Sequence, residues 1–227
     1  MEKIKEKMLC NGVNCDLQKF YVDGNVPMGS YDGLSIQQHF RIVKSFYELI
    51  KKTNPKQIIE IGTAAGGLTL MIRDILDDLG LNDTELITYD PSTPQYLLER
   101  IKSDNIKITY KNNNLFNYNY DNLSNPDEIK NLIQKEGVTI VLCDGGSKKN
   151  EFRLLSPFLK YGDIIMAHDY SPNEIYFQEH IINKVWYWLE IQDSDINQSC
   201  LDNNLKPYME DDFRQVVWVC KEKNQHE

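Results

Sequence analysis

Short runs of β-branched and other apolar residues alternate with helical stretches from Pro55 onward, and this alternation constrains the fold more than any other feature of the chain. The runs cover residues 57–61, 85–89, 106–110, 138–143 and 163–167. Between them, apolar residues recur at helical spacing, first at Leu68, Met71, Ile75 and Leu79 and later at Ile129, Leu132 and Ile133. Strands that are apolar throughout and are separated by helices are typical of a parallel sheet covered on both faces. We therefore predict an α/β fold with a doubly wound, mostly parallel sheet.

The segments on either side of this alternation have less regular patterns. Apolar residues on one face predict an amphipathic helix over 34–52, with Ser35 and Gln38 as its capping box. Residues 1–54 would then form an N-terminal arm and a helix that pack on a core domain of residues 55–227. A helix over 152–160 is expected to break at Pro157. After Asp169 we predict a helical face over 177–188, an exposed polar loop over 192–212 and a last strand over 215–220.

The charge balance and the absence of long apolar runs exclude several classes of protein. The chain carries 34 Asp and Glu residues against 25 Lys and Arg, a formal charge of −9, which is the opposite of the balance in most nucleic-acid binders. No apolar run approaches the roughly 18 residues that a membrane span needs. The first seven residues alternate in charge and lack the apolar core of a signal peptide. We expect a cytoplasmic protein that binds neither nucleic acid nor membranes.

A turn rich in small residues leads from the first strand of the alternation into the first helix. It reads Glu60-Ile61-Gly62-Thr63-Ala64-Ala65-Gly66-Gly67. Glycine lets the backbone approach a ligand closely, and the free N–H groups at a helix N-terminus favour an anionic group. Asp90 ends the next strand, 23 residues after Gly67, where an acid can accept hydrogen bonds from ribose hydroxyls. The pattern predicts a nucleotide-type site formed by Glu60, Gly62, Thr63, Gly66, Gly67 and Asp90.

A second group of polar residues follows the fourth and fifth strands. Asp144 comes directly after the fourth strand, and His168 and Asp169 follow the fifth. Because the C-terminal ends of neighbouring parallel strands face one crevice, the three side chains should meet beside the bound cofactor. Two carboxylates and an imidazole suit a divalent metal ion. The alternative is structural, with Asp144 capping the following helix and His168 and Asp169 serving as turn partners.

Both groups resemble motifs of a known family. The spelling Glu60-x-Gly62-x-x-x-Gly66-Gly67 looks like motif I of class I S-adenosylmethionine-dependent methyltransferases, in which Asp90 matches the ribose-binding acid. The run 216–219 would match the late antiparallel strand of their Rossmann-like fold. The residues at 144 and 168–169 resemble the metal-dependent O-methyltransferases, most closely the cephalosporin hydroxylase-like and rhamnosyl O-methyltransferase group. There, an Asp and an acidic pair bind magnesium, and His168 stands where the group commonly has Glu.

The resemblance implies an S-adenosylmethionine-dependent O-methyltransferase that acts on a hydroxyl of a small molecule, a sugar or a glycosylated metabolite. It implies a divalent cation, magnesium in the family, held by Asp144, His168 and Asp169, with Asp144 also near the cofactor. In related catechol-type enzymes, a lysine shortly after the first metal ligand is the general base. Lys148 and Lys149 follow Asp144 by four and five residues, so Lys148 is the candidate here and His168 is the competing base. The alternative is that the two lysines are solvated charge at a helix start. A nicotinamide-dependent oxidoreductase and a non-catalytic nucleotide-binding protein of the same fold stay open as alternatives, as does a homo-oligomer.

Overall fold

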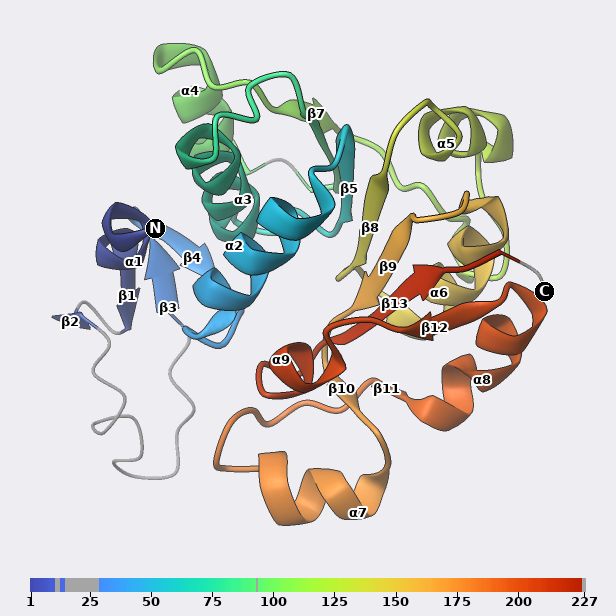
Figure 1. Cartoon of the computed structure of the whole chain (residues 1–227). Coiled ribbons are helices and arrows are strands. Elements are labelled where there is room, and N and C mark those ends of the chain that lie inside the picture. The colour runs from blue at the N-terminus through green and yellow to red at the C-terminus, as the bar shows by residue number, and fades with distance from the viewer. Residues whose placement is uncertain (11–12, 15–28, 93, 226–227) are drawn as a thin grey trace.

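A seven-stranded sheet forms the centre of the protein in the computed structural model, which describes residues 1–10, 13–14, 29–92 and 94–225 (Figure 1). The strand order is β12-β13-β9-β8-β5-β6-β7. All pairings are parallel except those of β13, which runs antiparallel to both of its neighbours. The strands are β5 (Gln57–Ile61), β6 (Glu85–Tyr89), β7 (Thr109–Lys111), β8 (Thr139–Cys143), β9 (Ile164–Ala167), β12 (Leu205–Pro207) and β13 (Val219–Lys223). The predicted doubly wound, mostly parallel sheet with a late antiparallel strand is confirmed.

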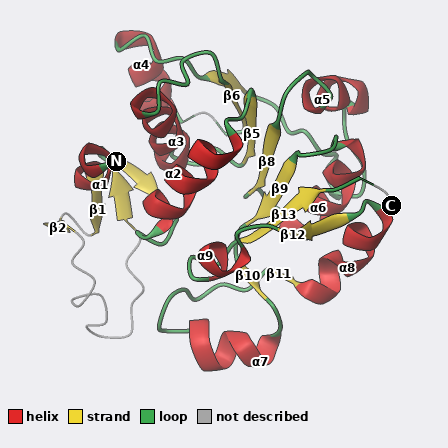
Figure 2. Cartoon of the chain, viewed as in Figure 1, coloured by secondary structure: helices red, strands yellow, loops and turns green. Residues whose placement is uncertain are grey.

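Side chains that alternate along the strands supply two separate cores, one on each face of the sheet. Ile58 and Leu86 belong to one cluster of buried residues, whereas their neighbours Ile59 and Ile87 belong to the other. The first cluster is covered by α2 (Ile42–Thr53), α3 (Gly67–Asp78), α4 (Gln95–Ser103) and α9 (Glu210–Arg214). The second is covered by α5 (Pro126–Ile133), α6 (Lys148–Leu155) and α8 (Asp193–Asp202). Figure 2 shows the helices in red around the yellow strands of the sheet. Burial on both faces explains why the central strands are mostly apolar.

Most of the predicted elements of the alternation lie within one residue of their observed bounds. The exception among the strands is β7, which begins at Thr109 rather than at residue 106. Ile106 and Ile108 precede it and pack against the core from an irregular segment, so their apolar character reflects burial without strand pairing. Helix α6 ends at Leu155 and continues as a short 3-10 turn, Ser156–Phe158, which agrees with the predicted break at Pro157.

The helix predicted over 34–52 begins only at Ile42, so its predicted capping box is wrong. Residues Leu34–Ile36 form strand β4, which pairs antiparallel with β3 (Gly29–Tyr31). Asp32 and Gly33 between them both have positive φ, 47° and 84°, as a tight Asp-Gly hairpin turn requires. A small sheet adds β1 (Met8–Cys10) and β2 (Val13–Asn14) after helix α1 (Glu2–Lys7). Part of the predicted N-terminal arm, at 15–28, lies outside the described residues.

The C-terminal third also differs from the sequence prediction. The predicted exposed loop over 192–212 contains α8, β12 and α9, together with the end of β11 (Ile191–Gln192), which pairs with β10 (Tyr170–Ser171). Helix α8 is mostly polar and buries only Ile196 and Ser199, so its sequence has no apolar face with helical spacing. The last strand begins at Val219 rather than at 215, since Val217 adopts a φ of 58° that breaks an extended run. Helix α7 (Glu174–Tyr176) passes into a π-helical turn, Phe177–Ile181, and the predicted helical face ends there.

The two parts of the predicted domain division share one of the two cores. Ile4, Tyr31 and Phe46 from the N-terminal segment lie in the same buried cluster as Ile58 and Leu70 of the sheet domain. Tyr31 donates a hydrogen bond to Asp74 of α3 at 2.6 Å, which ties the small sheet to that helix. Among the described residues, no helix is long and apolar enough to cross a membrane.

Candidate active site

The turn between β5 and α3 depends on glycine because backbone segments meet there. Gly62 and Gly66 have φ of 93° and 89°, a region that other residues seldom adopt. A Cβ atom at Gly62 would overlap the carbonyl oxygen of Asp144 and lie 2.9 Å from Gly145 Cα. One at Gly67 would lie 2.5 Å from the carbonyl oxygen of Ser35. The turn is therefore wedged between the end of β8 and strand β4, so its glycines have a packing role besides the predicted approach to a ligand.

Asp90 lies beside this turn, as its place at the end of β6 predicts. Its carboxylate accepts hydrogen bonds from the backbone N–H of Ala64 at 2.9 Å and of Ser92 at 2.7 Å. Thr63 lines the cavity described below, and its hydroxyl is paired with that of Thr88 at 2.5 Å. Because Asp90 bridges the turn and the next loop, it holds both segments in place.

Glu60 points away from this crevice. Its side chain is fully buried, accepts a hydrogen bond from Thr69 Oγ1 at 2.5 Å and is not among the residues that line the cavity. Burial raises the pKa of Glu60 to about 7, despite the hydrogen bond from Thr69. Glu60 therefore lies behind the turn, where its carboxyl group binds Thr69 in the first turn of α3.

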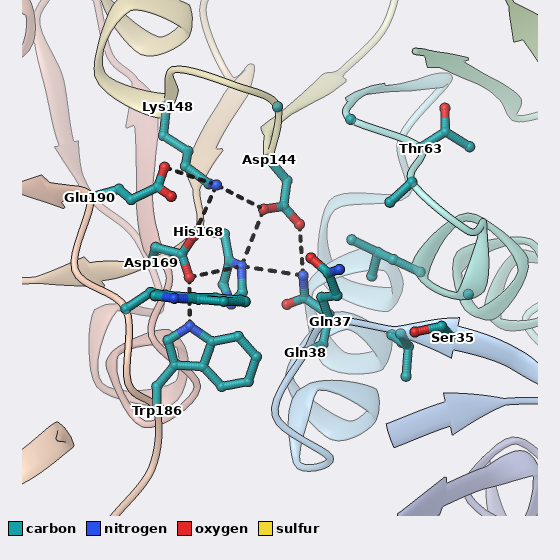
Figure 3. Close-up of a pocket in the computed structure, with 17 residues that line it drawn as sticks. Ser35, Gln37, Gln38, Thr63, Asp144, Lys148, His168, Asp169, Trp186 and Glu190 are labelled. Carbon is teal, nitrogen blue, oxygen red and sulfur yellow. Dashed lines mark hydrogen bonds and ion pairs between the residues drawn. The ribbon is translucent and has the colours of Figure 1, made fainter. Parts of the chain in front are cut away.

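A cavity of about 240 Å³ opens between the glycine turn and the ends of β8 and β9 (Figure 3). Thr63, Gly67 and Leu68 form one side, and the segment after β4 adds Gln37 and Gln38. The opposite side carries Asp144, Lys148, His168 and Asp169, with Trp186, Trp188 and Glu190 from the segment before β11. A ligand in this space would touch Gly62, Thr63 and Gly67 of the first predicted group and all three residues of the second, whereas Gly66 and Asp90 are not among the lining residues.

The three predicted metal ligands converge in this cavity. His168 Nδ1 lies 3.1 Å from Asp144 Oδ1 and 3.5 Å from Asp169 Oδ1, and one candidate ligand atom from each residue lies within 4.8 Å of the others. The backbone explains the meeting, because His168 N–H donates to the Cys143 carbonyl across the ends of β8 and β9. The helix-capping alternative for Asp144 is wrong, since Glu151 accepts the N–H groups of Gly145 and Ser147 instead.

Lys148 supplies the positive charge between these carboxylates. Its Nζ lies 2.9 Å from Asp169 Oδ2, 3.0 Å from Glu190 Oε2 and 3.8 Å from Asp144 Oδ1. Burial alone would lower the pKa of Lys148, but the carboxylates outweigh burial and raise it above its usual range. Lys148 is therefore an ammonium in this arrangement, and it cannot serve as a base until the carboxylates have another cation to bind.

His168 is held as firmly as the carboxylates. Its side chain is 2% exposed, and its ring stacks on Trp218 with centroids 5.0 Å apart and an interplanar angle of 28°. Burial would lower the pKa of His168, but Asp169 and Asp144 outweigh burial and raise it. The Nε2 atom is buried without a hydrogen-bond partner among the described residues.

Four residues of the site were not found from the sequence as parts of this cluster. Gln38 Nε2 donates to Asp144 Oδ2 at 2.7 Å, and Trp218 Nε1 donates to Gln38 Oε1 at 2.8 Å. Trp186 Nε1 donates to Asp169 Oδ1 at 2.6 Å, and Glu190 binds Lys148. These partners lie up to 180 positions apart in the chain, so no local motif connects them.

Comparison with solved structures identifies the same fold in other proteins. No protein family matches the sequence, and no curated protein does either. The apo structure of CmcI matches with a TM-score of 0.59 and 14% identity, over 87% of this chain and 76% of that one. CmcI with Mg and SAM matches with a TM-score of 0.54 and 14% identity, over 84% and 75% of the two chains. An O-methyltransferase family protein from Burkholderia thailandensis matches with a TM-score of 0.51 and 10% identity, over 82% and 56%. This chain therefore has the Rossmann-like fold of class I methyltransferases.

Proposed function

We propose that this chain, with its class I methyltransferase fold, is an S-adenosylmethionine-dependent O-methyltransferase that acts on a hydroxyl of a small molecule. The observation that carries the proposal is the cavity itself. One side of the cavity is the glycine turn between β5 and α3. The other side is the cluster of Asp144, Lys148, His168 and Asp169. A donor held at the turn and an acceptor held at the cluster would share a single space, which is what group transfer between them needs.

The sheet order favours methyl transfer over nicotinamide chemistry. Dinucleotide-binding domains have the strand order 3-2-1-4-5-6 in a parallel sheet. Here the antiparallel strand β13 is inserted between β9 and β12. The neighbours with the same fold support this choice, since one of them is a complex with SAM and another is an O-methyltransferase family protein.

We assign the cofactor to the glycine turn and Asp90. The backbone at Gly62, Thr63 and Gly67 would hold the amino-acid end of S-adenosylmethionine, and Asp90 would accept hydrogen bonds from its ribose hydroxyls. When bound, S-adenosylmethionine would supply its sulfonium methyl group to an acceptor oxygen and leave as S-adenosylhomocysteine. The chain contributes by positioning. Asp144, on the acceptor side of the cavity, lies directly beside Gly62 of the glycine turn, so donor and acceptor would be held next to each other.

We assign a divalent cation to Asp144, His168 and Asp169, whose donor atoms converge and suit such an ion. A cation there would lower the pKa of the acceptor hydroxyl and engage the carboxylates that now hold Lys148. Beside a cation the Lys148 ammonium would lose a proton to solvent more easily, and the neutral Nζ would then accept the proton of the acceptor hydroxyl. Glu190 would keep the lysine at the site, 3.0 Å away.

The wall beside the cluster indicates a flat, partly apolar acceptor such as a sugar or a glycosylated metabolite. Trp188 lines the cavity and is 41% exposed. Its ring meets that of Trp186 edge to face, with the ring centroids 5.9 Å apart. A tryptophan face of this kind packs against the apolar face of a ring while the polar groups around it bind hydroxyls. Gln37 and Glu190 are the polar neighbours in this structure.

The proposal is tested by titrating the protein with S-adenosylhomocysteine and with NAD in a calorimeter, followed by methyl-transfer assays on a panel of sugars with and without chelator. We expect binding of S-adenosylhomocysteine alone, and methyl transfer that Asp144→Asn abolishes. Asp83→Asn is the matched control, because Asp83 is exposed and lies before β6, at the opposite end of the sheet. Binding of NAD without S-adenosylhomocysteine would contradict the proposal. Activity that ignores chelator would leave a metal-independent methyltransferase with His168 or Lys148 as the base.

A further inference from the structure

We propose that the centre formed by Asp144, His168 and Asp169 selects a transition-metal ion such as Mn²⁺ over Mg²⁺, and that His168 Nδ1 is the ligand that sets this preference. The inference rests on the proposed cation site and names the ion that it takes. It begins with the identity of the third donor. Asp144 and Asp169 offer oxygen atoms, whereas the third candidate ligand atom is an imidazole nitrogen.

The imidazole cannot turn away to leave a site made of oxygen alone. Its ring packs against two tryptophans. The ring centroid lies 5.0 Å from that of Trp218, on which it stacks, and 5.2 Å from that of Trp186, against which it is tilted. His168 lines the cavity but is only 2% exposed, so the two tryptophan rings hold the imidazole in this orientation. With the ring fixed, Nδ1 stays 3.1 Å from Asp144 Oδ1 and 3.5 Å from Asp169 Oδ1, on the side where a shared ion would lie.

The hydrogen-bond network fixes which atoms face the centre. Trp218 Nε1 donates to Gln38 Oε1 at 2.8 Å, which defines the orientation of the amide and turns its NH₂ group toward Asp144 Oδ2, 2.7 Å away. Trp186 Nε1 holds Asp169 Oδ1 at 2.6 Å. Nε2 of His168 has no competing partner among the described residues, so the ring can carry its proton there and offer the Nδ1 lone pair to a metal ion. Outer partners of this kind orient metal ligands and raise affinity.

A donor set of two carboxylates and one nitrogen discriminates between ions. Mg²⁺ prefers oxygen ligands and gives up its water reluctantly. Imidazole suits transition-metal ions, for which the nitrogen adds affinity that Mg²⁺ cannot gain. Lys148 does not create the preference, because its ammonium competes with either ion through charge alone. It can withdraw toward Glu190, which it already contacts at 3.0 Å.

The test is calorimetric titration of the protein with Mn²⁺ and, separately, with Mg²⁺, using the change in tryptophan fluorescence as a second readout because Trp186 and Trp218 contact His168. We expect Mn²⁺ to bind about tenfold or more tightly than Mg²⁺. His168→Glu should bring the ratio close to one. Lys148→Met should tighten both ions and keep the ratio. His180→Glu is the matched control, since His180 is exposed and lies outside the centre, and it should change neither affinity.

Equal affinities in the wild type, or an unchanged ratio in His168→Glu, would overturn the inference. If His168→Glu does not fold, pulsed electron paramagnetic resonance of Mn²⁺ bound to the wild type decides, because a coordinated imidazole gives a nitrogen coupling and its absence overturns the inference. Binding of neither ion would overturn it as well. Calorimetry with S-adenosylhomocysteine in the same preparation keeps that failure distinct from a failure of the proposed methyltransferase function.

Discussion

Gly62→Ala should destabilise the protein far more than the same change at a glycine that has positive φ but open surroundings. At Gly62, φ is 93° and the new Cβ would overlap the Asp144 carbonyl oxygen. At Gly80, φ is 71° and nothing lies within 4 Å of the new atom. An L-residue in this region costs about 1–2 kcal/mol at either position. The overlap at Gly62 adds about 1–3 kcal/mol, because backbone cannot yield as a flexible side chain would.

Thermal unfolding of the two variants measures this difference. Since 1 kcal/mol shifts the midpoint of a domain of this size by roughly 2–4 °C, Gly62→Ala should melt about 2–12 °C below Gly80→Ala. Gly62→Ala should also weaken binding of S-adenosylhomocysteine, because the strain falls on Asp144 and on the turn. Equal midpoints for the two variants would refute the argument that the turn is wedged against the end of β8.

Three further predictions concern single side chains. Asp90→Ala should weaken S-adenosylhomocysteine binding roughly tenfold to a hundredfold in calorimetry, because a hydrogen bond to a charged acceptor contributes about 1.5–3 kcal/mol. Unchanged affinity would refute the role of Asp90. Glu60 has a pKa raised from 4.5 to about 7, so the folded state keeps a proton that the unfolded chain releases, and this group lowers stability as the pH rises through that window. Between pH 4.5 and 7, the unfolding free energy of Glu60→Gln should therefore rise relative to that of the wild type by up to about 1.4 kcal/mol per pH unit, as measured by denaturant titration. Unfolding free energies that change with pH in the same way for both proteins would contradict a raised pKa at Glu60. Trp186→Phe should cost about 2–4 kcal/mol of unfolding free energy, whereas Trp188→Phe, at a half-exposed site, should change little; equal losses would argue against the bond to Asp169.

The sequence predicted the elements whose burial is regular. Strands such as β5 and β6 are buried along their length, so their composition alone marks them, and the crossover rule then brings Asp144 and His168 to one edge of the sheet. The start of the helix predicted over 34–52 was wrong because Ile36 stands at helical spacing before Phe40 and Val43, although in the structure it belongs to strand β4. The Asp32-Gly33 dipeptide, whose residues both have positive φ, is the local feature that separates a hairpin from a helix here.

The parts of the site that escaped prediction depend on contacts between distant segments. Gln38 looked like a capping residue, and its actual partners, Asp144 and Trp218, are defined only once the sheet has formed. Lys148 lies near the cluster, but one of its three carboxylate partners is Glu190, which follows an irregular segment that carries no pattern. Residues that act through long-range packing leave no periodic trace in one sequence.

The most direct test of the account is a crystal structure of the protein with S-adenosylhomocysteine. The account predicts the ligand in the cavity between the glycine turn and the strand ends. Its ribose hydroxyls should lie within hydrogen-bond distance of the Asp90 carboxylate, and its sulfur should face Asp144 and Lys148. A ligand bound elsewhere, or one whose ribose contacts a residue other than Asp90 while the sulfur points away from Asp144, would contradict it.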